Sequence, residues 1–249
     1  MSGWRDVVSV AAGNVHAARN TGRSHTLALR ADGTVSATGW NGDGQCDVTG
    51  WNGVVFVTAG WRRTLGVSGD GTVTAAGRTD EGACEVGDWR EITAVAAGDW
   101  HSIGLRADGT VVATGNNHRG QCEIAGWQNI RGVSAGHLHT VAVTTDGLVL
   151  AVGDAGSGTA DVGRWRSIIA VAAGSRHILG VDAQGRVRAA GDNTRGQCNV
   201  LSWRDVIAVA AGAEHSLGLR ADGTVLFAGS NADGQCSVEE WRLGNGGIR

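Results

Sequence analysis

Histidine is the residue type in this sequence best suited to chemistry, and it recurs at one repeated position. The residues at this position, with an arginine in the second copy, are His25, Arg63, His101, His139, His177 and His215. Imidazole could serve as a base or as a metal ligand. Equivalent positions in successive repeats do not converge on a coordination sphere of about 2 Å. We therefore expect buried imidazoles that satisfy backbone groups between strands.

Cysteine shows the same regular spacing. The cysteines are Cys46, Cys84, Cys122, Cys198 and Cys236. A disulfide needs Cα atoms within about 7 Å, which separate repeat units do not provide, and the number of cysteines is odd. We expect free thiols that pack as small hydrophobic groups in a reducing compartment, without a metal.

Other signals of chemistry are incomplete. Residues 153–158 are glycine-rich but lack the lysine of a phosphate-binding loop, and residues 41–44 match only part of a calcium loop. Asp80 and Glu81 form an isolated acidic pair. Spacing alone assembles no nucleophile, base and orienting group, so we expect no enzyme and no cofactor. An enzyme with a site in a central channel is one alternative.

The elements that position these residues are tandem repeats, each opened by a tryptophan. The first copy begins at Trp4 and is nine residues longer than the others, which begin 38 residues apart. The later tryptophans are Trp51, Trp89, Trp127, Trp165, Trp203 and Trp241. We expect these tryptophans to fill the space between adjacent units. The predicted copies, within one domain over residues 1–249, are 4–50, 51–88, 89–126, 127–164, 165–202 and 203–240, with a closing segment 241–249.

Each copy is predicted to consist of β-strands. In the copy 89–126, residues 92–97 form an apolar run of small side chains, and Asp108-Gly109 marks a hairpin. Residues 122–124 could supply a fourth, outer strand. No 3.6-residue pattern reaches helix length, and a four-stranded unit of about 40 residues is typical of a propeller blade. We predict an all-β, single closed β-propeller of six blades with about four strands each, closed by pairing of the two termini; seven blades are the alternative.

Charge and hydropathy exclude several classes of partner. The formal net charge of −3 gives no overall electrostatic footprint for nucleic acid or an anionic membrane. No apolar run approaches the ~20 residues of a membrane span, and the first residues lack the plan of a secretory signal. We expect a cytoplasmic monomer with no nucleic-acid or membrane partner.

Three motifs in each copy resemble a known family. Residues 96–101 read Ala-Ala-Gly-x-x-His, residues 105–111 read Leu-Arg-Ala-Asp-Gly-Thr-Val, and residues 115–121 read Gly-x-Asn-x-x-Gly-Gln. They are similar to the repeat of the regulator of chromosome condensation 1 family, above all to the bacterial branch that includes the β-lactamase inhibitor protein II. The resemblance implies a propeller that recognises proteins with loops on one face. Family members of this kind have seven blades, so six copies are a departure.

Two loops in each copy vary in sequence, and they are expected to share one face. One is the pair of residues before the repeated histidine, and the other precedes Gly-Gln. The three tryptophans outside the repeat register, Trp40, Trp61 and Trp100, all fall in these loops. A cluster of aromatic and arginine side chains is typical of a binding hot spot. The predicted partner-binding residues are Trp40, Trp61, Arg62, Trp100, His118, Arg119, His137, Arg176 and Glu214.

The charged residues are expected to divide this face into a basic half and an acidic half. Basic residues, among them Arg63, adjoin the tryptophans, whereas Asp43, Glu214 and Asp233 are expected on the far side. The insertion at residues 14–22 is expected to lie beside Trp40 and Trp61. We predict a non-enzymatic protein-binding propeller, either an inhibitor or a targeting or scaffold module. A lectin is another alternative, with a glycan as its ligand, although lectin sites should repeat from blade to blade.

Overall fold

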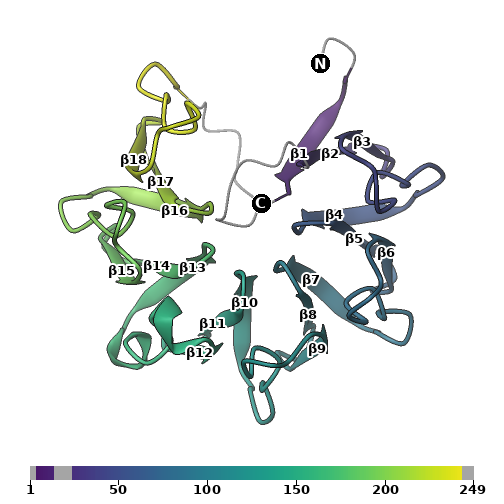
Figure 1. Ribbon diagram of the computed structural model, residues 1–249, viewed down its shortest axis with the longest axis horizontal. Coiled ribbons are helices and arrows are strands. Elements are labelled where there is room, and N and C mark those ends of the chain that lie inside the picture. Colours follow the sequence, from purple (N-terminus) through teal and green to yellow (C-terminus); the bar gives the residue numbers. More distant parts are fainter. Residues whose placement is uncertain (1–3, 14–23, 243–249) are drawn as a thin grey trace.

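The structure is a computed structural model that describes residues 4–13 and 24–242, and it contains six antiparallel three-stranded sheets, or blades, arranged radially (Figure 1). The strands are β1 (Val7–Ala12), β2 (His25–Arg30) and β3 (Val35–Gly39) in blade 1; β4 (Val54–Ala59), β5 (Arg63–Ser68) and β6 (Val73–Gly77) in blade 2; β7 (Ile92–Ala97), β8 (His101–Arg106) and β9 (Val111–Gly115) in blade 3; β10 (Ile130–Ala135), β11 (His139–Thr144) and β12 (Val149–Gly153) in blade 4; β13 (Ile168–Ala173), β14 (His177–Asp182) and β15 (Val187–Gly191) in blade 5; and β16 (Val206–Ala211), β17 (His215–Arg220) and β18 (Val225–Gly229) in blade 6. Two 3₁₀ turns, η1 (Ala155–Ser157) and η2 (Val162–Arg164), follow blade 4. The all-β, six-bladed propeller predicted from the sequence is therefore confirmed.

The Asp-Gly turns form the hairpins that the sequence predicts. In blade 3, the carboxylate of Asp108 accepts hydrogen bonds from the backbone N–H and the hydroxyl of Thr110, at 2.8 and 2.7 Å. Gly109 has a φ of +79°, which a residue without a Cβ adopts without strain. This turn joins β8 and β9 at the end of the blade away from the variable loops.

The first strand of each blade begins with a bulge. In blade 3, Ile92 pairs with Arg106 and Ala94 pairs with Leu105, so the register shifts by one residue. The residue before the bulge, Glu91, has a φ of +59°. The corresponding residue of blade 2 is Gly53, for which this left-handed conformation carries no steric penalty.

The fourth strand that the sequence predicted for each blade is absent from these sheets. In blade 3 it was expected at residues 122–124, but Glu123 N–H donates to Gly120 O and Ile124 N–H donates to Cys122 O, which makes successive turns. Asn117 Oδ1 accepts the N–H of Cys122 at 2.8 Å. Because a side chain and local turns already satisfy this backbone, the segment has no need of a strand partner.

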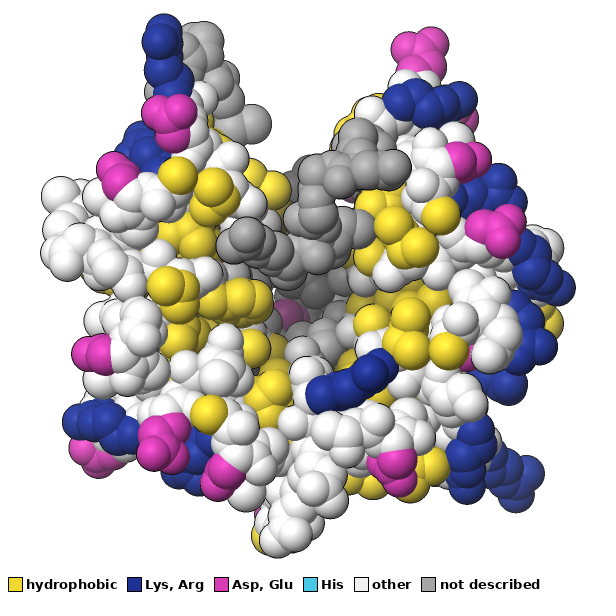
Figure 2. Space-filling view, turned by 180° about the vertical axis from the view of Figure 1, so that it is seen from behind, with side chains coloured by type: hydrophobic (Ala, Val, Ile, Leu, Met, Phe, Trp, Pro, Cys, Tyr) yellow, Lys and Arg dark blue, Asp and Glu magenta, His cyan; other side chains and the backbone are white. Residues whose placement is uncertain are grey.

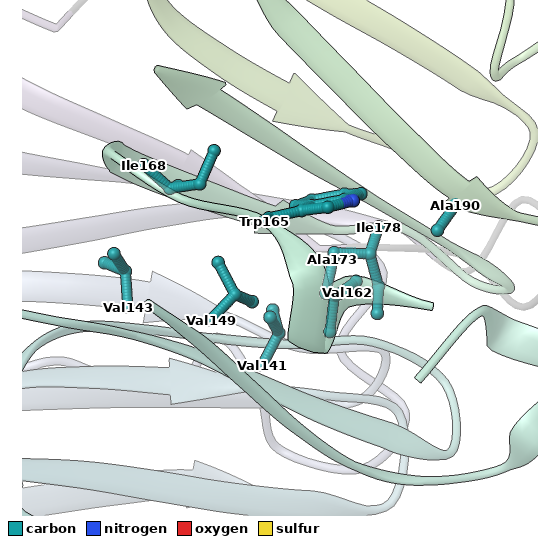
Figure 3. Close-up of a cluster of buried hydrophobic side chains, with 9 residues drawn as sticks. All are labelled: Val141, Val143, Val149, Val162, Trp165, Ile168, Ala173, Ile178 and Ala190. Carbon is teal, nitrogen blue, oxygen red and sulfur yellow. The ribbon is translucent and has the colours of Figure 1, made fainter. Parts of the chain in front are cut away.

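The periodic tryptophans pack between adjacent blades, as predicted. Figure 3 shows one such cluster, in which Trp165 lies between side chains of blades 4 and 5. The buried members of the cluster are Val141, Val143, Val149, Val162, Trp165, Ile168, Ala173, Ile178 and Ala190. A Cβ at Gly180 would lie 2.8 Å from the Trp165 ring, so glycine at this place allows the indole to approach the middle strand.

Blades 1 and 6 are the two ends of the series (Figure 1). No strand pairing joins them within residues 4–13 and 24–242, and the bridge formed by Arg242 is to Thr224 of blade 6. The closed ring predicted from the sequence is thus not detected. Val10 of β1 is 67% exposed, whereas the equivalent Val57 is 5% exposed. Trp241 is 51% exposed, so it is an exception to the predicted packing of the periodic tryptophans.

The repeated histidines connect one blade to the next. His101 Nε2 lies 2.8 Å from the hydroxyl of Thr140 in blade 4, and that hydroxyl donates to the backbone oxygen of Gln121 in the third repeat. His25 and His177 make the same contact with the following blade. The sequence predicted buried imidazoles, which is what these are, and their Nε2 atoms contact side-chain hydroxyls of the next blade, which the sequence did not predict.

Arg63 replaces the histidine in blade 2 and is completely buried. Its guanidinium donates to Ser102 Oγ and to the backbone oxygens of Gly98, Asp99 and His101. Arg63 therefore connects blades 2 and 3. The sequence predicted it at the surface beside the tryptophans, which is wrong because the side chain is buried between the blades.

The cysteines are free thiols, but four of the five are half-buried. Each thiol donates to a backbone oxygen six residues earlier in the chain; the Cys84 Sγ, for example, lies 3.1 Å from Arg78 O. They are thus hydrogen-bond donors of the turn before the next repeat, and only Cys236 is buried. Burial raises the pKa of the Cys122 thiol to about 11.

Across the part of the chain that the structure describes, no helix is long and apolar enough to cross a membrane. Figure 2 shows the molecule from behind, with arginine and acidic side chains interspersed around the rim and hydrophobic side chains nearer the centre. This mixture agrees with the small net charge of −3.

Candidate functional site

The two variable loops of each repeat are held together at one end of the blade. Trp40 N–H donates to Ser24 O, Arg78 N–H donates to Arg62 O, and Asn116 N–H donates to Trp100 O, each at 2.9 Å. Each bond joins the residue after the third strand to the loop before the second strand. The loops therefore share one face, opposite the Asp-Gly hairpins, as the sequence predicted. We call this end of the propeller the loop face.

Three of the predicted tryptophans lie side by side on the loop face with two arginines. The Trp61 and Trp100 ring centroids are 4.9 Å apart in an edge-to-face arrangement. The Arg62 guanidinium carbon lies 4.0 Å from the Trp61 centroid and 5.4 Å from that of Trp40. The Arg78 guanidinium carbon lies 5.0 Å from Trp100 and 6.0 Å from Trp61. We call these five residues the Trp–Arg patch.

Acidic side chains orient both arginines of the Trp–Arg patch. Arg62 pairs with Asp43 at 3.4 Å, and Arg78 pairs with Glu81 at 2.6 Å and with Asp80 at 3.3 Å. The sequence placed Asp43 on the far side of the face, which is wrong because it contacts Arg62. Asp80 and Glu81, which the sequence shows as an isolated acidic pair, both form ion pairs with Arg78.

A cavity of about 860 Å³ lies beside the patch on the loop face. It contains four of the predicted partner-binding residues, namely Arg119, His137, Arg176 and Glu214. The other lining residues are Leu138, Asp154, Ala155, Gly156, Ser157, Gly158, Asp161, Ser175, Gly191, Asp192, Thr194 and Ala213. Its wall combines charged side chains of both signs with apolar surface, and its volume is in the range of small-molecule sites.

The cavity lies at the repeat that lacks the histidine–hydroxyl contact with the next blade. Gln121 and Gln197 are buried in blades 3 and 5, but Thr159 takes this position in blade 4. The blade 5 residue equivalent to Thr140 is Ile178, which has no hydroxyl, so the His139 ring makes no hydrogen bond to a hydroxyl of the next blade. The short turns η1 and η2 replace the standard loop of the other blades.

Two hydroxyls in the cavity wall are unpaired. Ser157 and Ser175 are each 1% exposed, and neither Oγ has a hydrogen-bond partner among the residues that the structure describes. A buried hydroxyl without a partner is unusual in a folded protein and is expected to bond to a ligand or a water molecule.

His137 connects the patch with the cavity. Its ring centroid lies 6.5 Å from that of Trp100, and its Nδ1 lies 2.8 Å from Oδ2 of Asp99 in blade 3. Asp99 is buried, while His137 is half-buried and lines the cavity.

The predicted partner-binding residues thus fall into two neighbouring groups, one in the patch and one around the cavity. His118 belongs to neither: it is exposed, and its backbone N–H donates to Asn116 Oδ1. The insertion at residues 14–22 lies outside the described residues. Arg78 and Asp99 were not selected from the sequence, although both occupy the variable loops that the copies define.

The central channel is lined mainly by small side chains without reactive groups. A cavity of about 350 Å³ is lined by small residues of the first strands of the blades, including Ala59, Ala97, Ala173 and Ala211, with His215 as its titratable group. Within residues 4–13 and 24–242, no group of three or more His, Cys, Asp or Glu side chains is placed to hold a metal ion.

Four segments of the chain match the family model described as Regulator of chromosome condensation (RCC1) repeat. The matched residues are 20–45, 92–121, 168–197 and 206–235, which fall within the first, third, fifth and sixth copies. No curated protein matches the chain in sequence. The chain is thus a propeller built from RCC1-like repeats.

Solved structures share this fold at low sequence identity. Prp20p from Saccharomyces cerevisiae has a TM-score of 0.69 and 18% identity, over 90% of this chain and 72% of that chain. The CRINKLY WD40 ectodomain of the Arabidopsis thaliana receptor kinase ACR4 has a TM-score of 0.72 and 21% identity, over 90% and 85%. Yeast RCC1 (Prp20) bound to Kap60 has a TM-score of 0.71 and 17% identity, over 96% and 75%. At these identities, the likeness establishes the fold alone.

Proposed function

We propose that this chain is a protein-binding propeller that recognises a macromolecular partner with its loop face, and that the Trp–Arg patch is the centre of the interface. The single observation that carries the proposal is the contact of three non-periodic tryptophans from consecutive repeats with two arginines. The fold does not require these residues, because the other repeats form the same strands without them.

The physical properties of the patch suit recognition. Tryptophan and arginine are enriched in interface hot spots, where large rigid side chains bury much area at a low cost in conformational entropy. Trp40, Trp61 and Trp100 are each half-buried, so part of each residue lies at the surface. Arg62 and Arg78 are already oriented by acidic side chains, which reduces the entropy lost on binding.

The structural neighbours support a binding role. The structure of Prp20p is described with its binding to Gsp1p and histones, and yeast RCC1 is seen bound to Kap60. An inhibitor or a targeting or scaffold module are the two forms that we propose for this chain, and neither requires catalysis. A lectin is disfavoured because the loop tryptophans do not recur on all blades.

Affinity capture tests the proposal. The tagged full chain, a Trp61→Ala/Trp100→Ala variant and a Leu201→Ser variant would be used on the same cell extract, with quantitative mass spectrometry of the captured proteins. Leu201 is 78% exposed and lies outside the patch and the cavity, so its variant controls for the loss of an exposed apolar side chain. A partner should be captured by the wild type and by Leu201→Ser, but not by the double variant.

The captured partner would then be purified and titrated against the three proteins. Replacing two hot-spot tryptophans should weaken the affinity by more than about 100-fold, which corresponds to at least about 2.8 kcal/mol. Equal affinity for the double variant and the wild type would overturn the proposal. Melting temperatures of the variants show whether a loss of binding reflects unfolding.

The inhibitor form of the proposal has its own test, which follows from the resemblance of the repeats to β-lactamase inhibitor protein II. A purified β-lactamase is assayed with a chromogenic substrate in the presence of the chain. An inhibitor should slow hydrolysis, and Trp61→Ala/Trp100→Ala should restore it. Unchanged hydrolysis would exclude β-lactamase as the target and leave the targeting or scaffold form.

A further inference from the structure

The apolar cluster between two neighbouring blades is built from two sets of residues. Between blades 2 and 3, one set comes from the middle and outer strands of blade 2, and the other comes from the first strand of blade 3 and the tryptophan before it. The two sets are Leu65, Val67 and Val73 on one side, and Trp89, Ile92, Val95 and Ala97 on the other. All of these residues are buried. Each blade therefore relies on the blade before it and the blade after it for cover.

Blade 6 leaves its set of residues uncovered on the side away from blade 5. Leu217 and Leu219 are the equivalents of Leu65 and Val67 in blade 2. Both are half-buried, whereas the residues at these two positions are buried in all five other blades. Trp241, the next periodic tryptophan, is 51% exposed. The outer faces of terminal repeats are normally polar, so an apolar face at this end indicates a missing cover.

Blade 1 exposes the complementary set on its first strand, β1. Val10 is 67% exposed, whereas its equivalent Val57 is 5% exposed. Val7 is half-buried, although the residue at its position is buried in each of the other five blades. Val8 differs from both, because it is 64% exposed and its equivalent Val55 is 60% exposed as well. Val8 therefore lies at a position that points to solvent in an interior blade too, while Val7 and Val10 lack a preceding blade.

The polar contacts between blades also have two sides. In blade 3, the adjacent residues His101 and Ser102 bond in opposite directions. Ser102 Oγ accepts from Arg63 Nε of blade 2 at 3.1 Å, and His101 Nε2 lies 2.8 Å from the hydroxyl of Thr140 in blade 4. One pair of neighbouring side chains thus connects a blade to both of its neighbours.

These polar contacts are open at the two ends of the series. His215 of blade 6 is the equivalent of His101, and Thr26 of blade 1 is the equivalent of Ser102. Both are half-buried, whereas His101 and Ser102 are completely buried. Within the part of the chain that the structure describes, neither the ring of His215 nor the hydroxyl of Thr26 forms a hydrogen bond of the kind that joins the other blades. We call the open sides of blades 6 and 1 the seam.

One further copy of the repeat would satisfy both sides of the seam. Its first strand would cover blade 6, its middle and outer strands would cover Val7 and Val10, and its adjacent histidine and hydroxyl residues would reach Thr26 and His215. Figure 1 shows that blades 6 and 1 are separated by a wider arc than any other two neighbours, and no strand pairing joins them. A second copy of this chain fits less well, because its two open sides lie on different blades and each could cover only one side of the seam.

We propose that the seam is a docking site for a single β-blade of this repeat type, donated by another polypeptide. The donated blade is expected to carry a first strand of small apolar side chains and a histidine followed by serine or threonine, because these are the groups that the interior blades present to their neighbours. The seam is separate from the Trp–Arg patch, so this inference does not depend on the proposed function.

A binding experiment with the full chain tests the seam. The probe is a copy of residues 89–126 fused to a soluble carrier protein, and the carrier alone is the blank. Size-exclusion chromatography with light scattering should show a complex of one chain with one probe. Hydrogen exchange should slow in β1 and β17 of the full chain on binding, because both strands become covered.

Matched variants of the full chain then locate the binding site. Val10→Asp should weaken the affinity for the probe by on the order of 100-fold, because it would place an unpaired carboxylate in an apolar contact. The control Val8→Asp, at an equally exposed position that points away from the seam, should bind like the wild type. Replacing both His101 and Ser102 of the probe by alanine should weaken binding by roughly tenfold. Far-UV circular dichroism and melting temperatures show that the variants are folded.

Three results would overturn the proposal. The first is that the folded full chain binds no more probe than carrier. The second is that Val10→Asp and Val8→Asp bind the probe with equal affinity. The third is that the full chain alone forms oligomers that Val10→Asp dissociates, because the seam would then be occupied by a second copy of this chain.

Discussion

The guanidinium of Arg62 lies between two tryptophans of neighbouring repeats, 4.0 Å from the ring centroid of Trp61 and 5.4 Å from that of Trp40. Asp43, from the same loop as Trp40, holds it from the side at 3.4 Å. One arginine therefore fixes the relative position of two loops that belong to different blades. The order of the Trp–Arg patch depends on this side chain, because a planar cation stacks on both rings while it pairs with a carboxylate.

Replacing Arg62 should loosen the patch without unfolding the propeller. We expect Arg62→Ala to lower the free energy of unfolding by about 1 kcal/mol and to weaken the near-UV circular dichroism of the tryptophans. Arg62→Lys should recover only part of the signal, because an ammonium does not stack as a plane. Arg119→Ala, which has no aromatic partner in the described structure, is the matched control. A near-UV spectrum of Arg62→Ala identical to that of the wild type would contradict the assigned role.

The periodic tryptophans should differ in their contribution to stability according to their burial. Trp89 is 7% exposed and packs among Leu65, Val86 and Val95, so Trp89→Ala should cost about 3–5 kcal/mol through the cavity that it leaves. Trp241 is 51% exposed, and Trp241→Ala should cost less than about 1 kcal/mol. Urea denaturation of both variants measures the difference. Equal losses would mean that Trp241 is buried in solution.

The regular positions of the sequence predicted the scaffold well, because each has one physical role that recurs. The tryptophan spacing predicted six blades, and the Asp-Gly pairs predicted the hairpins. The prediction of a fourth strand was wrong because the side chain of Asn117 accepts a hydrogen bond from the backbone N–H of Cys122. A pattern of apolar residues gives no information about such a local contact.

The irregular positions predicted which loops matter but not how their side chains combine. Trp61 and Trp100 were selected because they break the register, and the structure places them in contact. Arg78 was missed because its side chain stacks on the indole rings of Trp61 and Trp100, which come from two different repeats. Asp99 was missed because its contact with His137 joins two repeats, and a comparison of residue types within each loop does not contain it.

Relief of backbone strain should stabilise blade 3. Glu91 has a φ of +59°, a conformation that costs a residue with a Cβ about 1 kcal/mol or more, and Gly53 occupies the same position in blade 2. We expect Glu91→Gly to raise the free energy of unfolding by up to about 1 kcal/mol, the gain from relieved strain exceeding the entropy that glycine costs. Glu91→Ala, which keeps the Cβ, should give no gain. A stabilised Glu91→Ala variant would show that the charge, and not the backbone, was responsible.

Buried histidines should make the propeller sensitive to mild acid. Burial lowers the pKa of His25 to about 4, of His139 to about 3 and of His177 to about 4, and it lowers the pKa of His101 well below its usual value. In the unfolded chain these groups titrate near 6.5. Between pH 6.5 and about 4, the unfolded state therefore binds protons that the folded state does not.

The stability of the protein should accordingly be greatest above pH 6.5 and fall as the pH decreases toward 4. Near pH 5, unfolding should take up roughly three to four protons, and each contributes a slope of about 1.4 kcal/mol per pH unit. The hairpin aspartates, such as Asp108, have pKa values lowered from 3.8 by the hydrogen bonds of the following threonine, so their contribution is lost only below this window. Urea midpoints measured from pH 7.5 to 4.5 give the slope.

The variant His139→Leu tests how much one buried histidine contributes to the pH dependence of stability. No side chain of the described residues bonds to the His139 ring, so leucine leaves no side-chain partner unsatisfied. The variant should bind about one proton fewer on unfolding near pH 5 and should lose less stability than the wild type between pH 6.5 and 4.5. His118→Leu, at an exposed histidine, should keep the wild-type slope. An unchanged slope in His139→Leu would mean that this imidazole is protonated in the folded protein, which its burial in blade 4 argues against.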